Sequence, residues 1–233
     1  MQEQLSLNVA LRDAYCFETF YPHAGNETLI HELSNIQMNT GRDSGNAQQF
    51  FIWGKSLSGK SHLLNAVCAR VESRVQYLPL KAIAHFGADV LAGLEESRLI
   101  AVDDIDHVLG DAKWEEGFFN LINKMRDNGH TLIFTANENP RHIDCNLNDL
   151  KSRLLWGASY QLIGLSDEDA AKALGLRAQY RGMEIPNEVT QFLIKRVSRD
   201  MSALVNVLDV LDQKSLQEKS KVTIPFVKRA LDL

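Results

Sequence analysis

The sequence contains Gly54-Lys55-Ser56-Leu57-Ser58-Gly59-Lys60-Ser61, a complete G-x-x-x-x-G-K-[ST] phosphate-binding loop. An apolar run, 50–53, precedes the loop, and apolar residues at helical spacing follow it. Glycines at the two ends let the backbone curl until successive N–H groups point at phosphate oxygens. Lys60 adds positive charge for the outer phosphates, and the Ser61 hydroxyl suits Mg²⁺. The pattern predicts a nucleotide site between a strand and a helix.

His62 follows this loop directly and is a further candidate contact with the nucleotide. An ordinary surface or core histidine is the alternative interpretation, and the sequence favours it.

A second apolar run, 99–102, ends in the acidic pair Asp103-Asp104. An apolar run of this kind fits a central strand of a parallel sheet. A phosphate-binding loop needs a carboxylate for its metal, so we expect Asp103 to hold Mg²⁺ through water. Asp104 is expected to orient the attacking water. Without the upstream loop, an acidic turn after a core strand would be the better interpretation.

A third apolar run, 131–136, is followed by Asn137. If this strand lies between the other two, the Asn137 amide is expected to reach the γ-phosphate or the attacking water. By residue type alone, Asn137 is an asparagine at a strand end, which is common in turns. Its order in the chain favours the functional interpretation.

Along residues 15–165, apolar runs that fit strands alternate with stretches that fit helices. Strands are expected near 49–53, 75–80, 99–103, 131–135 and 160–162, and helices near 60–73, 86–94, 114–127 and 147–154. This alternation predicts an α/β fold with a central parallel sheet and the nucleotide at the carboxyl ends of its strands. Residues 166–233 are expected to form a small all-helical subdomain, and residues 1–14 a flexible leader.

Composition limits the classes of protein that fit. The 233 residues carry 25 Lys and Arg against 30 Asp and Glu, and the net charge of −5 argues against a dominant DNA-binding surface. No apolar stretch approaches a bilayer span, and the N-terminus has no basic signal-peptide region. The three widely spaced cysteines do not indicate a disulfide framework. We therefore expect a cytoplasmic protein that does not contact a membrane.

These motifs, in this order, resemble the AAA+ module of the DnaA family of replication initiators over about residues 15–233. The resemblance implies that Arg153, in the segment Asn148–Leu154, is an arginine finger that acts in trans on a neighbour's γ-phosphate. Charge alone would indicate a solvated arginine at a helix end. The resemblance also implies that Arg199 is the sensor 2 arginine, which reaches the bound phosphates from the helical lid.

The N-terminal part of the module carries two more features of the family. Phe17, Phe20 and Asn26 lie in a segment that resembles the family's entry segment, which flanks the adenine. Ahead of it, Gln4-Leu5-Ser6-Leu7 resembles the peptide with which regulatory homologues of DnaA bind the polymerase sliding clamp, with Gln4, Leu5 and Leu7 as anchors. A disordered or edge-strand tail is the alternative.

Two positions depart from that regulatory subgroup. Asn8-Val9 follows the peptide where Pro-Leu is common, and Asn137 is an amide where the subgroup has a carboxylate. The first change bears on clamp affinity, and the second bears on the role of Asn137.

The resemblance implies an adaptor that holds ADP or ATP with Mg²⁺, links the sliding clamp (beta subunit) to DnaA, and stimulates hydrolysis of DnaA-bound ATP. Such a protein is a negative regulator of DNA replication, is expected to form homo-oligomers, and has no sequence-specific DNA binding of its own. The sequence leaves open whether the chain itself hydrolyses ATP. The alternative functions are a DNA-stimulated ATPase of the helicase-loader or transposition-helper type, and a scaffold whose nucleotide is purely structural.

Overall fold

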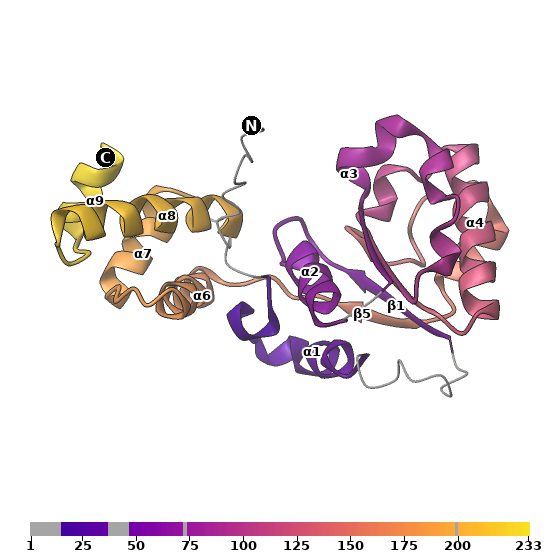
Figure 1. Cartoon of the computed structure of the whole chain (residues 1–233), viewed down its shortest axis with the longest axis horizontal. Coiled ribbons are helices and arrows are strands. Elements are labelled where there is room, and N and C mark those ends of the chain that lie inside the picture. Colours follow the sequence, from indigo (N-terminus) through magenta and orange to yellow (C-terminus); the bar gives the residue numbers. More distant parts are fainter. Residues whose placement is uncertain (1–14, 37–46, 72–73, 199) are drawn as a thin grey trace, which may run out of the picture. The chain divides into compact units, whose positions relative to one another are not determined.

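The computed structural model describes residues 15–36, 47–71, 74–198 and 200–233. They form two compact units: Pro22–Ser166, and residues 15–21 together with Asp167–Leu233 (Figure 1). Residues 15–21 were expected in the α/β part, whereas this short segment packs with the helical unit. The predicted clamp anchors Gln4, Leu5 and Leu7 and the predicted sensor Arg199 lie outside the described residues.

The first unit is built on a sheet of five parallel strands in the order β2-β3-β4-β1-β5. The strands are β1 (Gln48–Trp53), β2 (Val75–Pro79), β3 (Leu99–Asp103), β4 (Thr131–Ala136) and β5 (Ala158–Gln161). β4 lies between β1 and β3, which is the condition set above for a functional role of Asn137. Trp53 pairs with Ala136, so the phosphate-binding loop and Asn137 leave the sheet at the same level.

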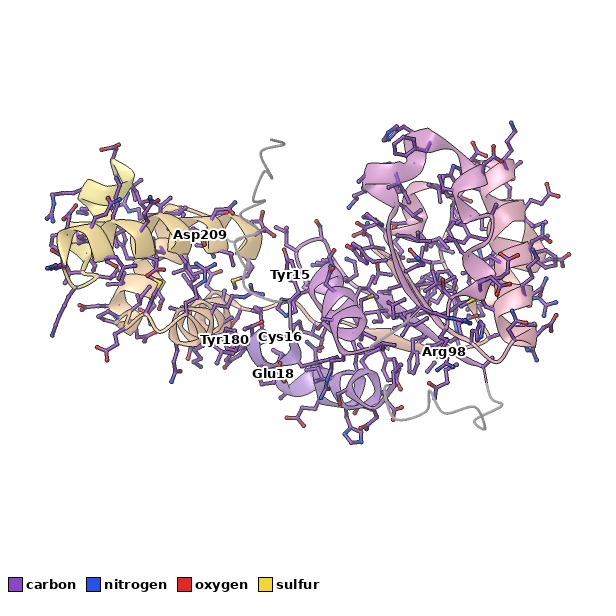
Figure 2. All side chains as sticks on the ribbon, viewed as in Figure 1. Tyr15, Cys16, Glu18, Arg98, Tyr180 and Asp209 are labelled. Atoms are coloured by element: carbon purple, nitrogen blue, oxygen red, sulfur yellow. The ribbon has the colours of Figure 1, made fainter. Side chains whose placement is uncertain are left out.

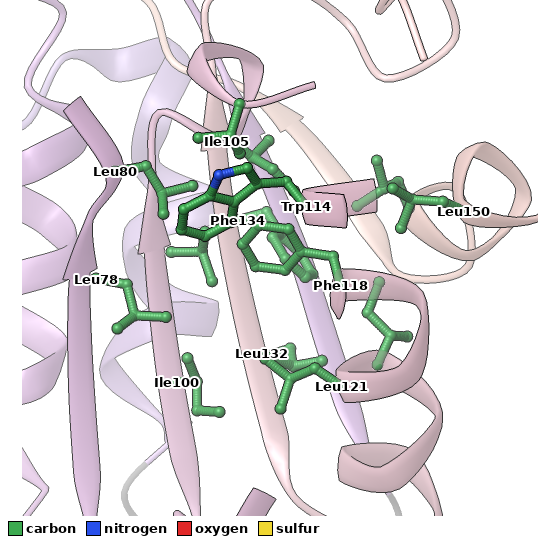
Figure 3. Packing of buried hydrophobic residues seen from close by; sticks show 14 of the residues in the cluster. Leu78, Leu80, Ile100, Ile105, Trp114, Phe118, Leu121, Leu132, Phe134 and Leu150 are labelled. Carbon is green, nitrogen blue, oxygen red and sulfur yellow. The ribbon is translucent and has the colours of Figure 1, made fainter. Parts of the chain in front are cut away.

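Helices cover both faces of this sheet (Figure 1). They are α1 (Glu27–Ser34), α2 (Lys60–Arg70), α3 (Leu80–Ile83), α4 (Ala112–Asp127) and α5 (Asn148–Leu154). Side chains alternate between the faces of a strand, so Ile100 and Phe134 pack with Trp114 and Phe118 of α4 (Figure 3). α2 packs on β2, β3 and β4 through its own buried residues, such as Leu63. Each such fully buried side chain contributes about 1.5–3 kcal/mol to stability.

Two local predictions differ from the structure. The helix expected near 86–94 is instead a series of short 3₁₀ turns, Ala84–Phe86, Ala88–Leu91 and Leu94–Glu96. Gly87 and Gly93 separate these turns with φ values of 80°, which a continuous right-handed helix cannot contain. The helix α1 was not anticipated, and it buries only Leu29 and Leu33 against the rest of its unit.

The second unit is helical, as expected, with α6 (Asp167–Tyr180), α7 (Asn187–Arg196), α8 (Met201–Glu218) and α9 (Ile224–Leu231). Asp209 of α8, labelled in Figure 2, pairs with Arg181 at the end of α6 at 2.9 Å. Asp200 caps α8 by accepting a hydrogen bond from the Ser202 backbone N–H. Within the described part of the chain, no helix is both long and apolar enough to cross a bilayer.

Candidate nucleotide site

The phosphate-binding loop connects β1 to α2, and both of its glycines are required by its shape. Gly59 adopts a left-handed conformation with φ 100° immediately before α2. A Cβ atom on Gly54 would lie 2.5 Å from the carbonyl oxygen of Leu162, which is too close for any other residue. The loop therefore presents the N-terminus of α2, where unpaired N–H groups favour phosphate.

The remaining loop residues divide between exposed and buried positions. Lys55, Ser56, Leu57 and Ser61 are exposed, whereas Ser58 is buried and its hydroxyl has no hydrogen-bond partner among the described residues. His62 is buried on α2 with interactions of its own. An unpartnered hydroxyl inside a phosphate-binding loop is consistent with a ligand that supplies the missing partner.

Lys60 reaches back across the loop from the first turn of α2. Its Nζ donates to the carbonyl oxygens of Gly54 at 2.7 Å and Lys55 at 3.1 Å, and to Oδ1 of Asn137 at 3.3 Å. Burial lowers the pKa of Lys60, and the nearby aspartates, Asp104 first among them, partly oppose this effect. Lys60 is thus held at the end of β4 as well as in the loop.

Asp103 ends β3, and hydroxyl donors meet both of its carboxylate oxygens. Tyr77 donates to Oδ2 at 2.8 Å, and Thr135 donates to Oδ1 at 2.6 Å. Burial, together with the charge of Asp103, raises the pKa of Tyr77, while the side chains of Asn65 and Ser61 act on the same hydroxyl in the opposite direction. The Tyr77 hydroxyl therefore binds Asp103, one of the two residues that the sequence predicted as metal ligands.

Asp104 is held in an unusual conformation directly after this strand. Its φ and ψ are both 56°, in the left-handed region, and its backbone N–H donates to Thr135 Oγ1 at 2.8 Å. Its carboxylate forms an ion pair of 2.8 Å with Lys81 of α3, which raises the pKa of Lys81. The predicted water-orienting carboxylate is therefore already bound to a cation in this structure.

Asn137 is linked to a residue that the sequence analysis did not single out. Its backbone N–H and its side-chain amide both donate to Oδ2 of Asp106, at 3.2 and 2.6 Å. The other oxygen of Asp106 is buried without a partner among the described residues. Since the Asn137 side-chain oxygen accepts from Lys60, the amide is oriented from both sides.

Asn26, which was predicted to lie beside the adenine, forms two hydrogen bonds with Ile163 within the first unit. Its side chain donates to the carbonyl oxygen of Ile163 and accepts from the Ile163 N–H, both at 2.9 Å, and it is 1% exposed. Phe17 and Phe20 belong to the helical unit, where Phe17 begins a short 3₁₀ turn. Contact of all three with a nucleotide stays a prediction.

Arg153 lies in the last turn of α5 and is stacked on aromatic rings. Its guanidinium carbon is 3.6 Å from the ring centre of Trp156 and 5.6 Å from that of Phe119. It forms no ion pair with an acidic residue in the described ranges of the chain. Its N–H groups are therefore not neutralised by a carboxylate of the described residues.

The residues at the ends of β1, β3 and β4 fit a nucleotide with Mg²⁺. They provide a glycine loop at a helix N-terminus, a buried lysine, and hydroxyl and carboxylate oxygens, which Mg²⁺ prefers. In the described part of the chain no cluster of three or more histidine, cysteine or acidic side chains forms a metal site.

Comparison with known proteins places this geometry in a family. Residues 11–161, more than half of the chain, match the model of the bacterial DnaA ATPase domain, and residues 167–231 match the lid domain of Hda.

Solved structures agree on the fold. Domain III of the Thermotoga maritima replication initiation protein DnaA has a TM-score of 0.76 at 20% identity, with 94% of this chain and 95% of that chain covered. AMPPCP-bound DnaA from Aquifex aeolicus has a TM-score of 0.66 at 18% identity, with 87% and 66% covered. The Thermotoga maritima RuvB Holliday junction branch migration motor has a TM-score of 0.63 at 15% identity, with 89% and 69% covered.

At such identities the likeness to solved structures shows the AAA+ fold alone, and the family models carry the assignment. The order of the strands, the position of Asn137 between the loop and the aspartates, and the helical second unit all agree with that assignment. The chain belongs to the bacterial DnaA ATPase family, as a DnaA-homologous AAA+ protein with a lid of the Hda type.

Proposed function

We propose that this chain is a nucleotide-bound adaptor that stimulates hydrolysis of ATP held by DnaA and thereby limits initiation of replication. The observation that carries the proposal is the environment of the Arg153 side chain. Its guanidinium stacks on Trp156 at the end of α5 and has no acidic partner in the described part of this chain. A stacked arginine keeps its N–H edge free for phosphate.

In this proposal Arg153 acts in trans. Its planar fork donates two N–H groups to the γ-phosphate oxygens of DnaA-bound ATP, where negative charge spreads in the transition state. The DnaA-related family and the Hda-type lid support DnaA as the partner.

The chain's own nucleotide has an organising role. Gly54 to Ser61 hold the phosphates of ADP or ATP, Ser61 and Asp103 hold Mg²⁺, and His62 lies behind the loop. When bound, the metal neutralises phosphate charge and orients the phosphate oxygens. Lys81 binds the carboxylate of Asp104 at 2.8 Å, and this ion pair favours slow turnover by the chain itself.

The family resemblance suggests further nucleotide contacts. Phe17, Phe20 and Asn26 are each proposed to contact the base, and Arg199 is proposed to contact the phosphates as sensor 2. These roles follow from the family resemblance of the residues. Each role can be tested by replacing the residue with alanine and measuring the affinity for nucleotide.

The leader, residues 1–14, is proposed to bind the second partner, the sliding clamp. Gln4, Leu5 and Leu7 bind a pocket on the DNA-loaded sliding clamp, which brings the adaptor to newly replicated DNA. Few residues suffice for this kind of binding, because an extended peptide places apolar anchors into a preformed pocket. Homo-oligomers of this chain are also expected from the family resemblance.

The test is hydrolysis of ATP by purified DnaA with this chain, with and without clamp loaded on DNA. The wild type is compared with a Gln4→Ala, Leu5→Ala variant, and Gln2→Ala serves as a leader control outside the clamp peptide. We expect stimulation that requires loaded clamp, is lost in the double variant and is kept in Gln2→Ala. Absence of stimulation, with DNA-dependent turnover by this chain alone, would favour a motor of the helicase-loader or transposition-helper type.

A further inference from the structure

Two arginines stack on one partly exposed tryptophan at the edge of the first unit. The guanidinium carbon of Arg153 lies 3.6 Å from the ring centre of Trp156, and that of Arg126 lies 3.8 Å from it. Trp156 is 43% exposed. Both guanidinium groups therefore lie against the same indole ring.

The backbone holds this stack in place from the β1 side. The Trp156 N–H donates to the Arg153 carbonyl oxygen at 3.1 Å, and Gln49 Nε2 donates to the same oxygen at 2.8 Å. A Cβ on Gly157 would lie 2.0 Å from the carbonyl oxygen of Gln49, so the chain after the indole is pressed against β1. These contacts fix the backbone of the tryptophan, and the two guanidinium groups pack against its ring.

Neither arginine is neutralised within the described residues of this chain. Arg126, near the end of α4, and Arg153 form no ion pair there, although lysines nearby do, such as Lys124 with Glu95 at 2.8 Å. An arginine that stacks by its flat face leaves the N–H groups of its edge available to a bidentate anion. The stack thus combines a fixed orientation with unused donors.

From this geometry we infer that Trp156 is a positioning residue for Arg153. The ring holds the guanidinium by its face so that the N–H edge is presented to the γ-phosphate of the partner's nucleotide, and Arg126 contacts the same ring. A free arginine side chain samples many rotamers, so a stacked one loses less freedom when it meets the phosphate. This role rests on the proposed function of Arg153 and adds a residue that does not itself touch the nucleotide.

The inference predicts a specific kinetic signature. Trp156→Ala lowers the maximal DnaA hydrolysis rate reached at saturating adaptor by about five- to tenfold, as expected for loss of stacking at a partly exposed site. The adaptor concentration that gives half of the maximal rate stays nearly unchanged. Trp156→Phe, which keeps an aromatic face, restores most of the rate. Phe86→Ala removes another exposed aromatic ring of the same unit and serves as the control.

A second measurement reports on the stack without DnaA. The fluorescence emission of Trp156 is obtained as the difference between the spectra of proteins with Trp156 and with Trp156→Phe. This emission is expected to change in both Arg153→Ala and Arg126→Ala, because each substitution removes a cation from the ring. Thermal unfolding with saturating ADP checks that every variant is folded and binds nucleotide.

The outcomes distinguish the positioning role of Trp156 from the proposed function of the chain. A full maximal rate for Trp156→Ala beside an active wild type would overturn the positioning role and leave the proposed function standing. Equal losses in Trp156→Ala and Trp156→Phe, or a loss in affinity alone, would also overturn it. A wild-type chain that does not stimulate DnaA would overturn the proposed function itself, and unchanged Trp156 emission in both arginine variants would overturn the stack.

Discussion

The side-chain amide of Asn137 and its backbone N–H share one acceptor, Oδ2 of Asp106, at 2.6 and 3.2 Å. The amide oxygen of the same residue accepts from Lys60. Asp106 therefore decides which way the Asn137 amide faces, and it connects the end of β4 to the turn after β3.

Replacing Asp106 by alanine is expected to lower the free energy of unfolding by about 1–3 kcal/mol, because it leaves two donors of Asn137 without an acceptor. Asp106→Asn keeps an oxygen at this place and is expected to lower it by less than half as much. Urea unfolding of both variants measures the difference, and equal effects would contradict the role given to the shared acceptor.

The buried hydroxyl of Thr135 in β4 contacts both Asp103, which ends β3, and Asp104, which follows it. It donates to Asp103 and accepts from the Asp104 N–H, and the residue is 0% exposed. Thr135→Val keeps the volume and removes both hydrogen bonds, so a loss of about 2–3 kcal/mol in the free energy of unfolding is expected. Thr135→Ser keeps the hydroxyl and is expected to lose less, mainly through one missing methyl. A milder effect of valine than of serine in denaturant unfolding would refute this assignment.

Lys60 gives the apo protein a defined pH dependence. Burial lowers its pKa in the folded state below the ordinary 10.5. Between the lowered pKa and 10.5 the unfolded chain binds more protons at this site, so the contribution of Lys60 makes the folded state more stable as pH rises through that window. Below the lowered pKa, the destabilising effect of the buried charge is fully present.

The measurement compares the free energy of unfolding of wild type and Lys60→Met at several pH values up to 10.5, without nucleotide. The difference between the two proteins should shift in favour of the wild type as pH rises. A constant difference over the whole range would show that the pKa of Lys60 is not lowered.

The ion pair between Lys81 and Asp104 should restrain intrinsic turnover. Lys81→Ala frees the carboxylate to orient water, and we expect ATP hydrolysis by the chain alone to rise by up to about fivefold, since a partly exposed pair is worth at most about 1 kcal/mol. Lys113→Ala changes another exposed lysine of the same unit and is the control. Turnover under saturating ATP with Mg²⁺ gives the answer, and a decrease in Lys81→Ala would mean that the lysine assists hydrolysis.

Much of the fold could be predicted from the sequence because its signals are local. The glycine loop, the apolar runs and the polar residues that follow them predicted all five strands and the parallel sheet, and β4 meets the condition of lying between β1 and β3. The helix expected near 86–94 is absent because Gly87 and Gly93 adopt positive φ values. Helix α1 has only two buried residues, which is too weak a pattern to stand out.

The candidate site could be predicted only in part, because its partners come from separate strands. Tyr77 contacts Asp103 across the β2–β3 pairing, and Lys81 reaches Asp104 from the following helix. Neither contact has a sequence signal, since it depends on strand register. Thr135 offered a signal in hindsight, because it is a polar residue inside an apolar strand, and so did Asp106, an additional acid directly after the pair.

The most direct test of the account follows labelled ATP that is held by DnaA alone. This chain is loaded with unlabelled ADP, added to DnaA with loaded clamp, and the labelled nucleotide on DnaA is recovered over time. The account predicts rapid conversion to ADP with the wild type, and conversion near the unstimulated rate with Arg153→Ala and Arg153→Lys, since lysine keeps the charge but not the fork. Rapid conversion by Arg153→Ala, with nucleotide binding intact, would contradict a finger supplied by this chain.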